Sequence, residues 1–141
     1  MKTRKSTRHA LHAAIEMALA WELAGDEGLV TAAEVAARYD LPPAVVAKIF
    51  QRLAQAGLAV GTRGVAGGYR LARPPAQVTV LEVIEVFERL DPEPHSGRGD
   101  PVPDAERRLG QLFAEIHEQS RATLASVTLE TLVKQRRALE A

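Results

Sequence analysis

The 141-residue sequence contains no cysteine. Disulfide bonds, thiolate redox chemistry, zinc sites with cysteine ligands and ordinary iron–sulfur clusters all require cysteine thiolates. The sequence therefore excludes each of these from this chain. Any metal site would have to be built from histidine and carboxylate ligands, and we expect no cofactor.

Long apolar runs and catalytic motifs are also absent. No run approaches the roughly 20 apolar residues that cross a bilayer, and no apolar segment follows the basic start, so we expect a cytoplasmic protein. The glycines match neither of the common phosphate-binding loops, and no plausible nucleophile with an acid–base partner can be recognised. We therefore expect that the protein is not an enzyme.

The chain as a whole has no net charge, but each half carries an excess of one sign. Eighteen Lys and Arg residues balance eighteen Asp and Glu residues. Residues 1–75 nevertheless hold ten basic and six acidic residues, a net charge of +4, whereas residues 76–141 hold eight and twelve, a net charge of −4. A basic half that meets phosphates is typical of a DNA-binding subunit, although chance alone can produce an asymmetry of this size.

The stretch from Thr31 onwards has the pattern of a helix-turn-helix. Thr31 is a good N-cap for a helix over residues 32–39. The run Asp40-Leu41-Pro42-Pro43 ends that helix and opens the next, because proline cannot continue a helix but suits its first turn. Gly57 is the predicted stop of the second helix. Two short helices joined by about four residues are typical of a helix-turn-helix, whose second helix enters the major groove.

A glycine-rich hairpin is predicted directly after these helices. Residues 58–60 and 69–71 are short β-like runs, and four glycines lie between them. The hairpin carries Arg63 and Arg70, and arginine on a thin projection suits phosphates or a narrow minor groove. An ordinary solvated hairpin has a similar composition, but the preceding helix-turn-helix favours a DNA-binding wing.

Few residues of the second helix can read bases. Ala44, Val45 and Lys48 lie toward its exposed N-terminal side; only Lys48 can donate to guanine, and the other two can touch a thymine methyl. A first helix is predicted from about Arg4 to Leu23, and its basic start is assigned to phosphate anchoring through side chains and N-terminal amides. The predicted DNA-contacting residues are Lys5, Arg8, Ala44, Val45, Lys48, Arg52, Arg63, Gly67, Gly68, Tyr69 and Arg70.

Beyond the wing, two helices separated by a loop are predicted. Thr79 caps the first, which we expect to run through Leu90. Residues 91–103 are rich in proline, glycine and charge, so they are predicted to form an exposed loop. An amphipathic helix then follows from Asp104 to about Ser126.

This long helix exceeds what a single small domain needs. Because the winged module closes its own core, we predict that residues 104–126 pack on a second copy in a two-fold homodimer. A final turn or two of helix is expected after Thr128, with a solvated basic end at residues 134–137. The predicted organisation is a winged helix-turn-helix domain over residues 1–90, a loop over 91–103, and a dimerisation helix with a tail over 104–141.

Several motifs occur together along the chain. They are Val35-Ala36-Ala37-Arg38 with Leu41-Pro42, Ile49-Phe50-Gln51-Arg52-Leu53 with Ala56-Gly57-Leu58, and the wing Arg63-Gly64-x-x-Gly67-Gly68-Tyr69. Together with the opening segment 5–11 and the later segments 78–84 and 128–133, they resemble the bacterial Rrf2 family of transcription regulators. The resemblance implies a mostly α fold with a small β-wing and a dimer that binds two half-sites. In cluster-binding members three cysteines occupy the region of residues 91–103.

Three histidines are candidate metal ligands. His9 and His12 are three residues apart and would face the same side of the first predicted helix. His95 lies in the loop where cluster-binding relatives carry cysteines. A half-buried, phosphate-facing or solvated histidine explains each of them more simply, so the sequence predicts no metal site.

The resemblance implies a DNA-binding transcription regulator. We expect a homodimeric repressor of a palindromic operator that carries no cysteine-ligated cluster. Its signal stays open between a small molecule, a partner protein and a metal bound by histidine and carboxylate. The rival is a protein-interaction or effector-responsive regulator with weak or no DNA binding of its own. A steep dependence of binding on salt would favour DNA.

Overall fold

The computed structural model describes residues 4–88 and 103–140, and helices predominate in these ranges. A small antiparallel hairpin is the only sheet among the described residues. This arrangement confirms the predicted fold class, mostly α with a β-wing. The elements are α1 (Lys5–Ala24), η1 (Gly25–Glu27), α2 (Ala32–Tyr39), α3 (Pro43–Gln55), β1 (Ala59–Thr62), β2 (Gly68–Leu71), η2 (Pro75–Gln77), α4 (Val80–Phe87), α5 (Asp104–Ser126) and α6 (Leu129–Glu140).

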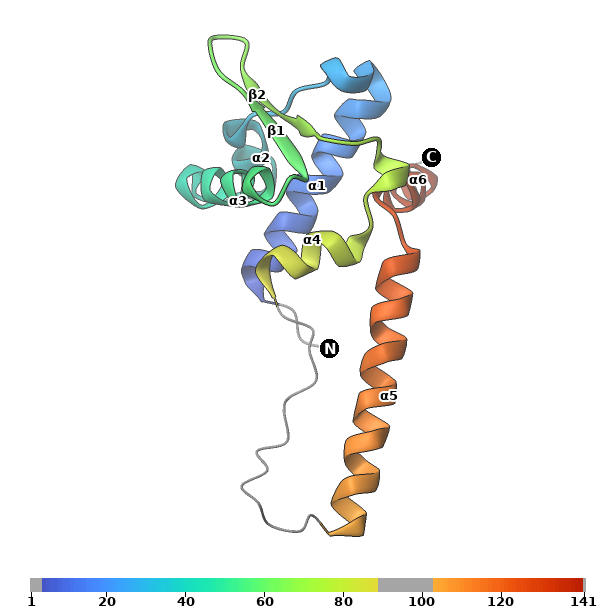
Figure 1. Cartoon of the computed structure of the whole chain (residues 1–141). Coiled ribbons are helices and arrows are strands. Elements are labelled where there is room, and N and C mark those ends of the chain that lie inside the picture. The colour runs from blue at the N-terminus through green and yellow to red at the C-terminus, as the bar shows by residue number, and fades with distance from the viewer. Residues whose placement is uncertain (1–3, 89–102, 141) are drawn as a thin grey trace.

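Helix α1 is the centre of the fold (Figure 1). It contacts α3, α4, α6 and β2. Its buried face is formed mainly by small side chains, which let neighbouring helices approach closely. These buried residues include Ala10, Ala13, Ala14, Met17 and Ala18. Within the described ranges, no helix combines the length and the apolar character of a membrane span.

The predicted helix-turn-helix is confirmed in α2 and α3. The Thr31 hydroxyl accepts from the Glu34 N–H at 3.1 Å, and the Glu34 carboxylate accepts from the Thr31 N–H at 3.2 Å, which completes a capping box. Helix α2 ends where Asp40 adopts a left-handed conformation, with φ of 53°. Pro43 then begins α3, as expected for a residue with a fixed φ and no N–H.

The wing is the hairpin formed by β1 and β2. Ala59 pairs with Leu71 and Thr62 with Gly68, so the first strand extends farther toward the tip than predicted. On the outer edge of β2, Val30 exchanges two backbone hydrogen bonds of 2.9 and 2.7 Å with Tyr69, which ties β2 to the segment before α2. A Cβ atom at Gly67 would lie 2.3 Å from the Thr62 carbonyl oxygen. The tight wing therefore requires glycine at that position.

Two boundaries in the C-terminal half differ from the predictions. Helix α4 ends at Phe87 and not at Leu90, because Glu88 is extended and its carboxylate bonds to the start of α1. Helix α6 spans 12 residues instead of a turn or two. It is long because Leu129 and Val133 are fully buried in the core, against which the helix packs. The predicted loop at 91–103 lies outside the described residues except for Pro103.

Helix α5 has the predicted bounds and a different environment from the other helices. It extends well past the rest of the described chain (Figure 1), and none of its 23 residues is buried. It is joined to α4 by an ion pair of 2.6 Å between Arg121 and Glu85, and the Val80 N–H donates to the Val127 carbonyl at 2.8 Å. The chain then enters α6, which returns to α1.

Candidate nucleic-acid interface

The outward face of α3 lies opposite the side chains that the helix buries. Val46, Ile49, Phe50 and Leu53 form the buried stripe. The exposed residues at positions 44, 48, 51 and 55 are spaced by three or four and share the other face. The predicted Ala44 and Lys48 belong to this face, and Val45 at its margin is 40% exposed. Among the described residues, Lys48 forms no ion pair.

Arg52 is predicted to contact DNA, but its guanidinium has partners within the fold. It donates a hydrogen bond of 2.7 Å to the Val86 carbonyl. The same group lies 4.3 Å from the centroid of the Phe87 ring, in a cation–π contact. Arg52 thus joins the recognition helix to α4, and its contact with DNA stays a prediction.

The wing presents Arg63 more openly than Arg70. Residues 61–66 of the hairpin are exposed, and in the part of the chain that the structure describes, Arg63 forms no ion pair. Arg70 is half-buried, and its Nη1 donates to the Leu71 carbonyl at 3.0 Å. Of the two predicted wing arginines, Arg63 is therefore the more exposed, and its contact with DNA stays a prediction.

Tyr69 positions the wing against α3. Its ring stacks on the ring of Phe50, with centroids 4.7 Å apart and an interplanar angle of 11°. Phe50 is fully buried, so the stack connects the wing to the core. Gly68 is also confined, because a Cβ atom there would lie 2.9 Å from the Val30 carbonyl oxygen. These residues shape the surface; whether they touch DNA stays a prediction.

The N-terminus of α1 is hydrogen-bonded to a carboxylate from a distant part of the chain. Glu88 Oε1 accepts from the backbone N–H of Arg4 and, at 2.9 Å, from the Thr7 hydroxyl. The side chain of the N-cap residue, Arg4, forms no capping hydrogen bond. The Glu88 carboxylate instead accepts hydrogen bonds at this end of the helix. The Arg4 amide is consequently engaged within the fold, whereas the side chains of Lys5 and Arg8 are exposed; their contact with phosphates stays a prediction.

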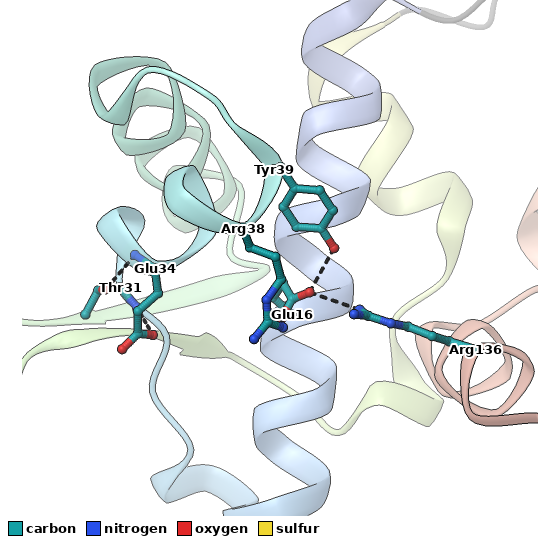
Figure 2. A network of polar contacts seen from close by, with 6 residues as sticks. All are labelled: Glu16, Thr31, Glu34, Arg38, Tyr39 and Arg136. Atoms are coloured by element: carbon teal, nitrogen blue, oxygen red, sulfur yellow. Dashed lines mark hydrogen bonds and ion pairs between the residues drawn. The ribbon is translucent and has the colours of Figure 1, made fainter. Parts of the chain in front are cut away.

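A buried glutamate anchors the first helix of the helix-turn-helix (Figure 2). Glu16, 6% exposed, accepts from Arg38 at 2.5 Å, Tyr39 at 2.8 Å and Arg136 at 3.0 Å. Its neighbours belong to α2 and α6, so one carboxylate joins three helices. The pKa of Tyr39 is raised to about 12 by burial and by the hydrogen bond to Glu16. The phenol therefore stays a donor at neutral pH.

Glu16 was not among the site residues predicted from the sequence, and only its charge within an otherwise apolar helical face could have indicated it. The prediction of a solvated basic end at 134–137 is wrong for Arg136, which is half-buried, whereas Arg137 is exposed as predicted. Arg136 bonds to Glu16, and Arg137 forms an ion pair of 2.6 Å with Glu22. Both pairs follow from the packing of α6 on α1.

The two candidate histidine ligands that the structure describes, His9 and His12, do not belong to a cluster that could hold a metal ion. The His12 ring stacks on Tyr39 with centroids 4.4 Å apart. Burial lowers the pKa of His12, and the nearby His9 and Arg8 lower it further. Within residues 4–88 and 103–140, no group of three or more His, Asp or Glu side chains could hold a metal ion. His95 lies outside the described residues.

Comparison with known proteins gives consistent results. The Rrf2 family model, described as "Iron-dependent Transcriptional regulator", matches residues 3–135. BadM of Rhodopseudomonas palustris, a candidate HTH-type transcriptional regulator, is 33% identical over 134 residues, or 95% of this chain and 82% of BadM. The HTH-type transcriptional regulator IscR of Cereibacter sphaeroides is 38% identical over 99 residues, or 70% of this chain and 63% of IscR. The structure of CymR, the global cysteine regulator of B. subtilis, superposes with a TM-score of 0.77 at 29% identity, covering 96% of this chain and 98% of CymR.

The family description names iron, and the residues of this chain do not fit a cysteine-bound cluster. The sequence has no cysteine, and His9 and His12 are not joined by a third ligand among the described residues. The winged helix-turn-helix, in contrast, is complete in α2, α3 and the hairpin. The chain belongs to the Rrf2 family and is a DNA-binding transcriptional regulator with a winged helix-turn-helix fold.

Proposed function

We propose that the protein is a homodimeric repressor that binds a palindromic operator, without a cysteine-ligated cluster and without catalytic activity. The observation that carries the proposal is the presence of exposed cations on two neighbouring elements, Lys48 on α3 and Arg63 on the wing. Neither side chain forms an ion pair among the described residues. A helix in the major groove with a neighbouring basic hairpin can use one cation for a base edge and the other for phosphate or minor groove. Because its target would be chromosomal DNA, we place the protein in the cytoplasm.

The dimer part of the proposal rests on α5. Its apolar stripe remains open to solvent: Leu109 is 52% exposed, Leu112 49%, Phe113 64% and Ile116 50%. A helix of this length extends for about 35 Å, given a rise of 1.5 Å per residue. A second copy of α5 would cover the same stripe on both subunits, as a two-fold interface requires. Two recognition helices would then face the two half-sites of a palindrome.

The proposed DNA contacts are tested by replacing the two cations separately. We expect Lys48→Ala and Arg63→Ala each to weaken operator binding by about 1 to 3 kcal/mol, with a shallower salt dependence for any phosphate contact that is lost. Fluorescence anisotropy would be measured over a salt series with DNA selected by the wild-type protein. Lys134→Ala is the matched control, because Lys134 is an exposed cation on α6, across α1 from α3 (Figure 1). Affinity unchanged in both test variants would refute the proposed surface.

A further inference from the structure

The outward face of α3 offers few hydrogen-bonding groups. Its exposed residues, opposite the buried stripe, are Ala44, Lys48, Gln51 and Gln55. Arg52 would be a strong base reader, but its guanidinium is held by the Val86 carbonyl and the Phe87 ring. The polar groups left on this face are one amine and two carboxamides.

Gln51 lies one turn beyond Lys48 on the same face. Residues three apart in a helix are separated by about 4.5 Å along its axis, which is close to the roughly 3.4 Å between successive bases of one strand. A helix that places Lys48 over one base pair therefore brings Gln51 close to an adjacent one. Gln55 lies a further turn toward the C-terminus of α3, whereas base contacts concentrate toward the N-terminal part of a recognition helix.

The carboxamide of glutamine is complementary to adenine. Its NH₂ group can donate to adenine N7 while its oxygen accepts from the N6 amino group, and no other base offers that acceptor–donor pair in the major groove. Glutamine is also uncharged, so it adds no general attraction to phosphate. A contact by Gln51 would change which sequence is preferred more than how strongly DNA is bound overall.

We propose that Gln51 is a specificity-determining residue that reads an adenine in the major groove, next to the base pair contacted by Lys48. The inference rests on the proposed operator binding by α3. Gln51 was not among the base-reading residues predicted from the sequence, which were Ala44, Val45 and Lys48. The outward position of Gln51, together with the engagement of Arg52 by α4, is what singles it out.

The test is a selection of binding sites from random double-stranded DNA by full-length wild-type, Gln51→Ala and Gln55→Ala proteins. We expect the wild type and the Gln55→Ala control to enrich the same motif. Gln51→Ala should lose the preference for one adenine in each half-site by roughly 5- to 150-fold and keep the remaining positions. The slope of affinity against salt should be the same for Gln51→Ala and the wild type, because no charge is removed.

A modified base makes the assignment direct. Replacing that adenine by 7-deazaadenine removes the N7 acceptor, which should weaken wild-type binding and leave Gln51→Ala binding unchanged. Equal losses in both proteins would overturn the proposal, and so would an unchanged motif in the Gln51→Ala selection. Failure of the wild type to enrich any sequence would instead overturn the operator-binding function itself, so the two failures are distinguishable.

Discussion

Helices α3 and α5 show two outcomes of the same sequence pattern. Each carries four large apolar side chains at positions i, i+3, i+4 and i+7, beginning at Val46 in α3 and at Leu109 in α5. In α3 these side chains are at most 3% exposed, whereas in α5 they are 49 to 64% exposed. Apolar periodicity therefore predicts which face of a helix avoids water but does not say whether its own chain covers that face. For α5 the cover we propose is a second copy.

The largest expected effect is the loss of a buried side chain from α3. Leu53→Ala removes a fully buried group, so we expect the free energy of unfolding to fall by about 2 to 5 kcal/mol. Urea unfolding at one fixed protein concentration would measure it. Gln55→Ala on the exposed face of the same helix is the control, with an expected change within about 0.5 kcal/mol. Similar values for both variants would contradict the burial of this stripe.

The next effect concerns the exposed stripe of α5. Phe113→Asp places a carboxylate in the proposed interface, and an unpaired charge buried against apolar groups is strongly unfavourable. We expect dimerisation to weaken by roughly 100-fold or more, which corresponds to about 2.7 kcal/mol, while the helical content of each subunit is kept. Sedimentation equilibrium combined with circular dichroism would show both properties.

The control for this substitution is Gln111→Asp. Gln111 is exposed and lies on the opposite side of α5 from Phe113. This variant should remain dimeric, because the same charge then faces solvent. A wild-type protein that is monomeric at micromolar concentration would show that α5 is not covered by a second copy, and it would favour the interaction-module alternative.

The smallest expected effect concerns the ion pair that joins α5 to α4, and it tests how weakly α5 is held by its own chain. Glu85→Gln removes the ion pair with Arg121, whose side chains are 40% and 37% exposed respectively. Ion pairs this open to solvent contribute at most about 1 kcal/mol, so we expect a small decrease in the urea midpoint and no change in dimerisation. A decrease as large as that of Leu53→Ala would mean that α5 is held firmly by its own chain.

Much of the DNA-binding module could be predicted because its signals are local. The capping box of Thr31 and Glu34 begins α2, and Pro42 and Pro43 separate it from α3. The glycines mark the wing because Gly67 has no room for a side chain. Each signal acts through atoms only a few residues apart, so reading the chain in order is sufficient.

The roles of individual arginines could not be predicted in the same way. Arg52 and Arg63 are both basic residues within or beside the helix-turn-helix, and sequence reasoning assigned both to DNA. The structure engages Arg52 with Val86 and Phe87, more than thirty residues later in the chain, and leaves Arg63 exposed. In the sequence, an arginine that will be exposed cannot be distinguished from one that will bond to another element. The difference arises only when the fold brings distant elements together.

The sequence by itself determined the helix-turn-helix and the wing, because caps, prolines and glycines act on residues only a few positions away. It also determined the absence of cysteine ligands, because composition does not depend on the fold. The tertiary structure decided where α4 ends, how far α6 extends and which three helices meet at Glu16. Glu88 bonds to the start of α1, and Arg136 reaches Glu16 across 120 positions of the chain. Such contacts depend on packing between remote segments, and no periodicity within one segment encodes them.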